Sequence, residues 1–339
     1  MVKIIVDGFG GDNSPQDVVS GAVEATKRKS DLRIVLTGKK EVLVKLLEEK
    51  DYNPDKFEII DAPEVIEVDA VPTVEFKTKP DSSMVKAFEF LRKEDDIQGL
   101  VSAGSSGAVL VGGLFKLGRI HGISRPAFCP LLPTFGGNTV LLCDSGANID
   151  CKPSNLGDFA IMAREYAKII LNLENPRVGL LNIGVEAEKG NIASKEYYEY
   201  LSQMRNINFV GNIEGHDMMA DKCDVLVTDG FGGNIALKSA EGGIKLMAKV
   251  LKTKIKDSFW GKIGAVTLMR GSLKKLKNHL ENYTEKGAIL LGCKKLVIKA
   301  HGNSSSSVFC NTILQAAEMA EARLCDKIEQ VFKENKTEE

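Results

Sequence analysis

One pattern recurs along the chain and constrains its fold: a short β-branched run, a turn of glycine and small polar residues, and then an amphipathic helix. In the first copy, the run Val2–Val6 leads into a glycine-rich turn, and Ser14 and Pro15 supply the expected cap and first turn of a helix. Strands that alternate with helices form parallel or mixed sheets with helices on both faces. We therefore predict an α/β fold of three layers (α/β/α) with a mixed, mostly parallel sheet. Further copies begin at residues 32–37, 97–101, 140–143 and 178–183.

Length and composition bear on the domain organisation. The chain has 339 residues, of which 43% are hydrophobic, and no low-complexity linker interrupts it. We predict one catalytic unit of two joined lobes over residues 1–332 and a frayed, charged tail over 333–339. The net charge of −1 gives no reason to expect a nucleic-acid partner. No stretch has the apolar length of a membrane-spanning helix, so we expect a cytoplasmic protein.

The cysteines and histidines argue against a metal centre or a redox pair. The seven cysteines include no CxxC pair, and several lie inside apolar runs, where an inert buried thiol is the simpler interpretation. The four histidines include no HExxH motif. We therefore predict neither a metal nor a cofactor.

A glycine-rich segment follows the apolar run 223–228. Its sequence is Asp229-Gly230-Phe231-Gly232-Gly233-Asn234, and we expect a helix over 235–241. A glycine-rich turn at a helix N-terminus offers free backbone N–H groups and the positive end of the helix dipole, which favour phosphate or another anion. The spacing matches neither GxxxxGK[ST] nor GxGxxG, so neither common nucleotide-binding loop is indicated.

Short motifs follow one another in order over nearly the whole chain. They are Asp7-Gly8-Phe9-Gly10-Gly11-Asp12, Ser102-Ala103-Gly104, Arg125-Pro126-Ala127, Asp144-Ser145-Gly146-Ala147-Asn148, Leu181-Asn182-Ile183-Gly184, Lys189-Gly190-Asn191, Gly211-Asn212-Ile213-Glu214-Gly215, 229–234 and His301-Gly302-Asn303-Ser304. Together they resemble the phosphate acyltransferase family of bacterial phospholipid synthesis. The resemblance implies transfer of a fatty acyl group from acyl carrier protein to inorganic phosphate, with a glycerol-3-phosphate acyltransferase acting downstream. It also implies a fold similar to that of phosphotransacetylases and the isocitrate dehydrogenase group, and a homodimer that needs no metal.

The residue types present suit this chemistry. Attack of phosphate on an acyl thioester requires an anion site and a stabiliser for the tetrahedral oxyanion, whereas the thiolate leaves readily because the pKa of its conjugate acid is about 8.5. Phosphate is itself the nucleophile, and positioning the two reactants supplies much of the rate. The absence of GxSxG agrees with a reaction that needs no acyl-enzyme.

Two residues are the candidate catalytic groups. Lys189 begins a predicted helix, where its charge opposes the helix dipole, and a bound phosphate or a developing oxyanion would explain its presence. The alternative is a surface lysine paired with Glu186 or Glu188. Asn234 is placed to donate from its amide to the acyl oxygen, or it is simply an N-cap.

Other polar residues near strand ends are candidates for binding phosphate or substrate. For each, a purely structural alternative remains: asparagines favour turns, aspartates cap helices, small residues permit close packing, and a lone histidine is commonly structural. The family usually has asparagine and threonine where this chain has Ser105 and Ser106, which leaves a side-chain role there open. The candidates are Gly10, Asp12, Ser102, Gly104, Ser105, Ser106, Asn148, Asn182, Asn191, Asp229, Gly232, Gly233 and His301.

The segment from about 250 to 280 combines basic and apolar residues. We expect a helical hairpin in which Trp260, Lys262, Ile263 and Val266 contact an anionic membrane peripherally or the acidic surface of acyl carrier protein. The alternative is a hairpin whose apolar side packs in a dimer core.

Functions of other classes remain open from the residues alone. They are a phosphotransacetylase-like enzyme acting on acyl-CoA, a decarboxylating dehydrogenase on a related fold, and a non-catalytic phosphate or acyl-carrier binding protein. A dehydrogenase of that type would need arginines clustered for a carboxylate substrate and a metal-binding aspartate cluster, and the chain shows no such arginine cluster.

Overall fold

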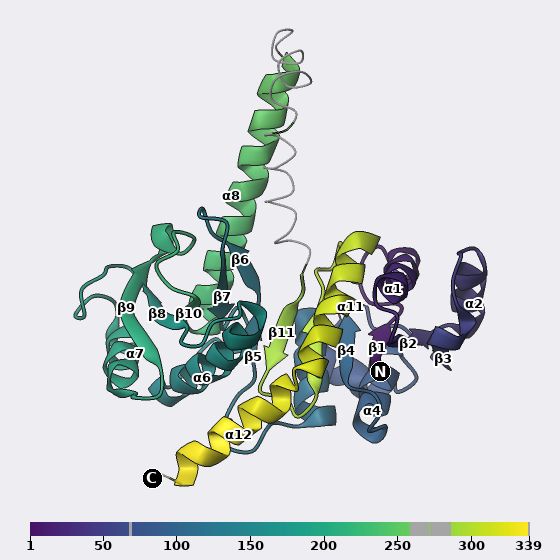
Figure 1. The fold of residues 1–339 in the computed structure, drawn as a ribbon, viewed down its shortest axis with the longest axis horizontal. Coiled ribbons are helices and arrows are strands. Elements are labelled where there is room, and N and C mark those ends of the chain that lie inside the picture. Colours follow the sequence, from purple (N-terminus) through teal and green to yellow (C-terminus); the bar gives the residue numbers. More distant parts are fainter. Residues whose placement is uncertain (68–69, 258–270, 272–285, 338–339) are drawn as a thin grey trace.

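The strands of the protein form two mixed sheets in a computed structural model that describes residues 1–67, 70–257, 271 and 286–337 (Figure 1). The larger sheet has the order β3-β2-β1-β4-β12-β11-β5, and only β11 runs antiparallel to its neighbours. Its strands are β1 (Val2–Asp7), β2 (Leu32–Gly38), β3 (Phe57–Asp61), β4 (Gly99–Ser102), β5 (Ala127–Cys129), β11 (Ala288–Leu291) and β12 (Leu296–Lys299).

The smaller sheet has the order β6-β7-β10-β8-β9, and only β6 is antiparallel to its neighbour. The predicted α/β class with mixed, mostly parallel strands is confirmed, although the strands are divided between two sheets. The strands are β6 (Leu131–Pro133), β7 (Thr139–Cys143), β8 (Arg177–Asn182), β9 (Asn208–Glu214) and β10 (Val225–Val227).

Helices cover both faces of each sheet. On the larger sheet, α1 and α11 pack on one face and α4 and α5 on the other. On the smaller sheet, α6 and α7 cover one face, while the first turns of α8 cover the other. One hydrophobic core contains buried residues from both sheets, so the two lobes are joined by packing. The α-helices are α1 (Gln16–Arg28), α2 (Lys40–Glu48), α3 (Pro72–Thr78), α4 (Ser83–Lys93), α5 (Ser106–Gly112), α6 (Pro153–Ile170), α7 (Ile192–Gln203), α8 (Gly230–Asp257), α11 (Ser306–Glu321) and α12 (Leu324–Thr337).

Three element boundaries differ from the sequence-based expectation. Helix α1 begins at Gln16, and the Ser14 hydroxyl donates to the carbonyl of Gly11 instead of capping the helix. The glycine-rich segment 229–234 is not a turn before a helix, because α8 already begins at Gly230. Helix α12 continues to Thr337 and so includes most of the segment 333–339 for which we expected a frayed end.

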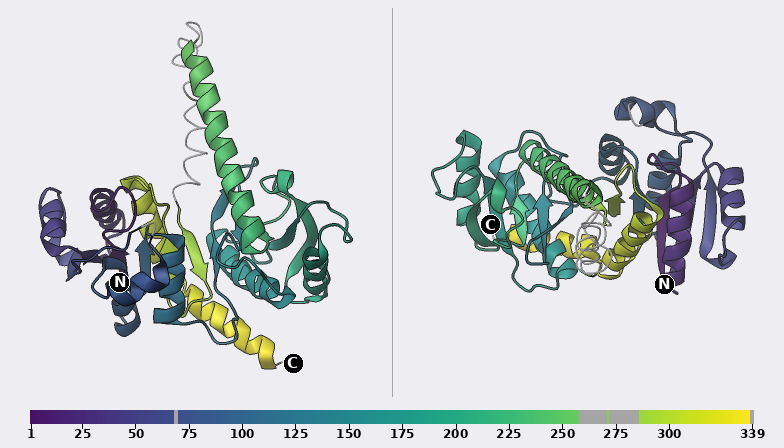
Figure 2. Two further views of the ribbon diagram at one scale, coloured as in Figure 1. Left: turned by 180° about the vertical axis from the view of Figure 1, so that it is seen from behind. Right: turned by 90° about the horizontal axis from the view of Figure 1, so that it is seen from above.

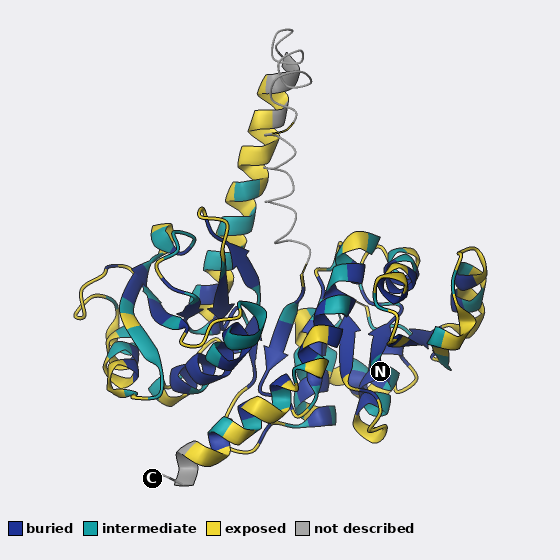
Figure 3. Ribbon diagram, viewed as in Figure 1, coloured by how far each residue is buried: buried dark blue, intermediate teal, exposed yellow. Residues whose placement is uncertain are grey.

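Helix α8 rises between the two lobes and extends well beyond them (Figures 1 and 2). Its far half is largely exposed (Figure 3). Among the described residues, no helix combines the length and apolar character needed to cross a membrane. Most of the expected hairpin lies outside the described residues, as do Trp260, Lys262, Ile263 and Val266.

Candidate functional site

The first group of predicted site residues lies at the carboxyl edge of the seven-stranded sheet. The amide of Asp12 donates to the carbonyl of Gly302 at 2.7 Å, which ties the turn after β1 to the turn after β12. A Cβ atom on Gly10 would lie 2.8 Å from the amide nitrogen of Gly104, so the turns after β1 and β4 also touch. The structure therefore brings together Gly10, Asp12, Ser102, Gly104 and His301.

Several polar side chains of this group hold the turns in place. The Ser102 hydroxyl donates to Asp7 Oδ2 at 2.7 Å and accepts from the amide of Gly104 at 3.1 Å. Burial raises the pKa of the Asp7 carboxyl, against the opposing effect of hydrogen bonds from Ser83, Ser102 and the backbone. The Ser105 hydroxyl accepts from the amide of Ala108 and caps α5, whereas Ser106 is exposed.

The second group lies at the carboxyl edge of the five-stranded sheet and is organised by Asp144, which follows β7. Its buried carboxylate accepts hydrogen bonds from the amides of Phe128, Gly146, Ala147 and Asn148, at 2.7 to 3.2 Å. Burial raises the pKa of Asp144, and these hydrogen bonds oppose that shift. The carboxylate is satisfied within the protein, and it fixes the loop that packs against the start of α8.

The glycine-rich start of α8 is therefore not an open anion cradle. Asp229 caps the helix, since its Oδ1 accepts from the amide of Gly232 at 2.6 Å. The amide of Gly233 donates to the Asp229 carbonyl, and that of Gly230 donates to the Asn148 carbonyl at 2.7 Å. These amides are occupied, and a carboxylate already lies at the helix N-terminus. Gly230 and Gly233 instead allow α8 to approach the Asp144 loop closely.

The side-chain amide of Asn234, near the start of α8, can still donate a hydrogen bond. It lies in the second turn of α8, so it is not the N-cap, and its side chain is exposed. One amide hydrogen donates to the carbonyl of Ser145 at 3.3 Å. The bond orients the side chain and leaves the second amide hydrogen available.

Lys189 lies in the loop between β8 and α7, which a network of hydrogen bonds holds in place. Asn182 Nδ2 donates to the carbonyl of Lys189 at 3.2 Å and to Asn212 Oδ1 at 3.1 Å. Asn212 in turn donates to the carbonyl of Glu186 at 2.8 Å. The Lys189 side chain is exposed, and within the described ranges it forms no salt bridge with Glu186 or Glu188.

The three predicted asparagines position these loops. Asn148 Nδ2 donates to the carbonyl of Pro126 and to Asp144, and Asn182 likewise uses both amide hydrogens. Asn191 caps α7, because its Oδ1 accepts from the amide of Ser194 at 2.8 Å. Their sequence signal, an asparagine near a turn, corresponds here to internal hydrogen bonding.

Helix α8 connects the two groups. Asn234, Lys238, Glu241 and Lys245 are spaced so that they share one face of the helix. Burial lowers the pKa of His301, as do the charges of Lys238 and Lys245, while Glu241 opposes them. The helix face that begins at the Asp144 loop therefore passes His301 in the other lobe.

Two features of this region were not predicted from the sequence. Lys299 ends β12 beside His301, and burial together with the charge of Lys238 lowers its pKa to about 8, while Glu241 opposes this shift. Large apolar side chains, 52% to 80% exposed, also surround the carboxyl edge of the smaller sheet. We call this set the apolar rim; it comprises Ile149, Ile183, Val185, Ile192, Phe231 and Ile235.

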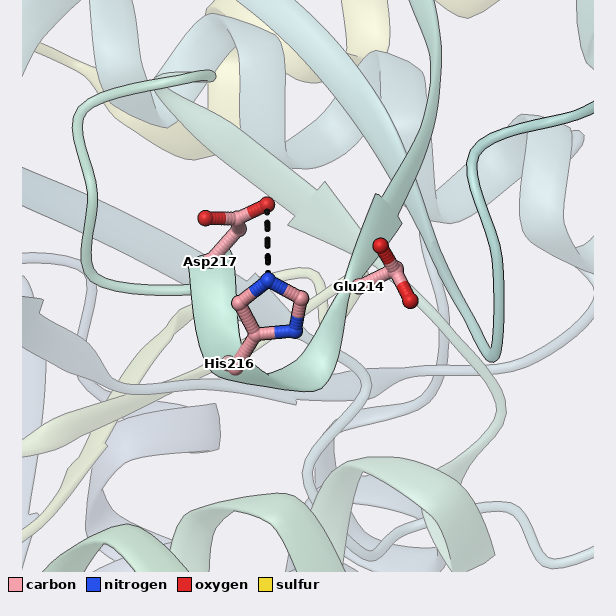
Figure 4. Close-up of side chains that lie close together, drawn as sticks. All are labelled: Glu214, His216 and Asp217. Carbon is pink, nitrogen blue, oxygen red and sulfur yellow. Dashed lines mark ion pairs between the residues drawn. The ribbon is translucent and has the colours of Figure 1, made fainter.

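A cluster of three metal-ligating residue types lies at the end of β9, where Glu214 pairs with Asn182 at the same carboxyl edge of the smaller sheet. Ligand atoms of Glu214, His216 and Asp217 lie within 4.8 Å of one another (Figure 4). Asp217 Oδ2 already accepts from the ammonium of Lys222 at 2.5 Å, which lowers the pKa of this carboxyl. Because a lysine neutralises the carboxylate, we assign no metal to this cluster.

None of the seven cysteines, all of which lie in described segments, forms a disulfide; five are buried and two are partly buried. Burial raises the pKa of Cys151, Cys223 and Cys325 to about 12 in each case, so these thiols remain protonated and weakly nucleophilic at neutral pH.

Comparisons with known proteins agree with this architecture. A family model described as "Fatty acid synthesis protein" matches residues 2–327. The chain is 43% identical to a phosphate acyltransferase of Clostridium tetani over 331 residues, covering 97% of each protein, and 43% identical to one of Thermoanaerobacter pseudethanolicus over 330 residues, again covering 97% of each. Its fold is similar to the crystal structure of a phosphotransacetylase from Streptococcus pyogenes, with a TM-score of 0.63 at 18% identity over 95% of this chain and 94% of that one.

Proposed function

This chain belongs to the fatty acid synthesis protein family, whose relatives carry the name phosphate acyltransferase, and we propose that it transfers a fatty acyl group from acyl carrier protein to inorganic phosphate. It is an acyltransferase that forms acyl phosphate. The observation that carries the proposed roles is the position of two available donors, the Lys189 ammonium and the Asn234 amide, at the ends of neighbouring strands β8 and β10.

The proposed reaction is a direct transfer. A phosphate oxygen attacks the thioester carbonyl carbon, the C–O bond forms, and the C–S bond breaks after a tetrahedral oxyanion intermediate. The pantetheine thiolate leaves and takes up a proton from solvent. Asn234 donates a hydrogen bond to the oxyanion, and the Lys189 ammonium stabilises the negative charge that phosphate and the oxyanion share.

One assay tests the reaction. Palmitoyl-acyl carrier protein and inorganic phosphate, incubated with the protein in the absence of NAD and added metal, should yield hydroxylamine-reactive acyl phosphate. Palmitoyl-CoA in place of the carrier thioester distinguishes the phosphotransacetylase-like alternative. If the folded protein gives no acyl phosphate from either donor, the proposal is contradicted. The remaining candidate functions are then a decarboxylating dehydrogenase and a non-catalytic binding protein.

The apolar rim supports a fatty acyl substrate. Ile149 follows the Asp144 loop after β7, Phe231 lies in the first turn of α8 after β10, and Ile183 follows β8. Because β7, β10 and β8 are neighbours, these exposed side chains all follow adjacent strands at the edge that carries Lys189 and Asn234. Apolar side chains grouped at such an edge commonly mark a binding surface.

We expect Phe231→Ser to raise KM for a palmitoyl donor by about tenfold, since the ring loses part of its burial against the acyl chain. KM for a butyryl donor should change little. The matched control is Phe135→Ser, because Phe135 is 84% exposed but precedes β7, at the opposite edge of the same sheet. An equal change in KM for the palmitoyl and the butyryl donor would show that Phe231 does not contact the acyl chain.

We propose that the segment 250–280 mediates peripheral membrane contact, and that the protein acts in the cytoplasm as a homodimer ahead of a glycerol-3-phosphate acyltransferase. Support comes from the basic and apolar composition of the segment and from Met247 and Val250 of α8, which are 76% and 50% exposed.

The combined change Trp260→Ser and Ile263→Ser should reduce sedimentation with anionic liposomes about tenfold and leave activity in solution unchanged. Light scattering during size-exclusion chromatography gives the oligomeric state of both proteins. A variant that becomes monomeric, or that loses activity in solution, would instead place these side chains in a dimer core or against the carrier protein.

A further inference from the structure

Lys299 ends β12 on the face of the larger sheet against which the Asp144 loop packs. In β12, Leu296 and Ile298 belong to the core on one face of the sheet and Val297 to the core on the other. Because side chains alternate along a strand, Lys299 lies on the face of Val297. Packed against that core is Ala147, from the loop that Asp144 organises.

The strands beside Lys299 present small residues. Ser102 of β4 and Ala288 of β11 are its direct neighbours in the sheet. The Ser102 hydroxyl already donates to Asp7 and accepts from the amide of Gly104. Neither neighbour has a carboxylate of its own, and the carboxylate of Asp7, beyond Ser102, already accepts from the Ser102 hydroxyl.

The Lys299 ammonium has no anionic partner among the described residues. Its Nζ donates to the carbonyl of Ala300 at 3.1 Å, and no described carboxylate lies within salt-bridge distance. The charged and titratable groups near it are His301, on its own segment, and Lys238 and Glu241 of α8, which already pair with each other at 3.0 Å. Because Lys238 and Glu241 neutralise each other, the half-buried Lys299 cation lacks a counter-charge of its own, which is unfavourable unless an anion binds there.

We propose that Lys299 binds the inorganic phosphate, placing the phosphate site on the larger sheet opposite Lys189 and Asn234 on the smaller one. This inference rests on the proposed function, because it names the residue that holds one of the two substrates. With the amides of Gly230, Gly232 and Gly233 occupied, Lys299 supplies the positive charge that the glycine-rich segment does not.

Equilibrium dialysis with radiolabelled inorganic phosphate, without an acyl donor, tests the inference. We expect Lys299→Met to weaken phosphate binding at least about tenfold at pH 7 and Lys299→Arg to retain most of the affinity. The matched control is Lys294→Met, which removes an exposed lysine from the turn that precedes β12 and should bind as the wild type does.

The pH dependence provides a second readout. The amine is charged below its pKa of about 8, so binding of sulfate, whose charge is constant over this range, should fall as pH rises through about 8. This fall in sulfate binding near pH 8 should be absent in Lys299→Met. Because the folded pKa lies below the unfolded one, the charged amine disfavours folding, and Lys299→Met should unfold at an equal or higher temperature at pH 7.

Phosphate binding by Lys299→Met at wild-type affinity would overturn the inference. That result leaves the proposed function intact if the wild type still forms acyl phosphate. Conversely, phosphate binding that depends on Lys299 in a protein unable to form acyl phosphate would refute the function and support the site.

Discussion

Replacement of Lys189 by alanine should lower the turnover number for acyl phosphate formation about a hundredfold, the typical effect of removing one donor to a developing oxyanion. The backbone at Lys189 is held by the hydrogen bonds of Asn182 and by its own amide, which donates to the carbonyl of Glu186 at 3.1 Å. The exposed side chain forms no salt bridge in the described part of the chain, so its removal leaves no buried group unpaired.

The matched control for this prediction is Lys195→Ala, which removes an exposed lysine from α7, a few residues along the same segment. Its turnover number should remain within about twofold of the wild type, as expected for surface substitutions. Initial rates at saturating phosphate and acyl donor, with circular dichroism as a check on folding, provide the measurement. Normal turnover by folded Lys189→Ala would remove this residue from the mechanism.

Gly233→Ala should destabilise the protein by about 3 kcal/mol, at the upper end of the usual cost of overpacking. The added Cβ would collide with the carbonyl oxygen of Asp144 and approach Thr228 Cγ2 to 2.9 Å. Both neighbours are fixed, because Asp144 is held by its loop and the Thr228 amide donates to the Cys143 carbonyl at 2.7 Å. Helix α8 must shift at its first turn, which also displaces Asn234 and lowers turnover.

Gly242→Ala in the same helix is the control. A Cβ there meets no atom within 4 Å, and alanine favours a helix over glycine by about 0.5 to 1 kcal/mol, so this variant should be more stable. The midpoints of urea unfolding measure both changes. Equal shifts in the two variants would show that the contact between α8 and the Asp144 loop is not tight.

Local patterns were sufficient to predict some parts of the site. The loop between β8 and α7 was expected from an apolar strand, a glycine and a following helix, whereas the capping of α7 by Asn191, a predicted binding residue, was not. The start of α8 was wrongly predicted because glycine has low helix propensity. Packing against Asp144, far away in sequence, makes glycine necessary at the positions where the helix approaches most closely.

The division into two sheets and the role of Lys299 depend on contacts between distant segments. In sequence, Lys299 is only a polar residue at the end of an apolar run. Its environment consists of Ser102 on β4, Ala288 on β11 and Lys238 on α8, which no local pattern brings together. Strand order is set by pairing across the whole chain, and for this reason the periodicity indicated the strands but not their distribution.

Helix α8 is anchored at the candidate site by its first turns, and the rest of the helix projects away from the site. Its 28 residues correspond to about 42 Å, and only the first turns pack on the smaller sheet. A rigid rotation of about 5° about the first turn would move the far end of the helix by roughly 4 Å. Asn234, which is close to that turn, would move by only a small fraction of this distance. A displacement at the far end of α8 would therefore leave Asn234 almost unmoved beside the Asp144 loop, to which it is hydrogen-bonded through the carbonyl of Ser145.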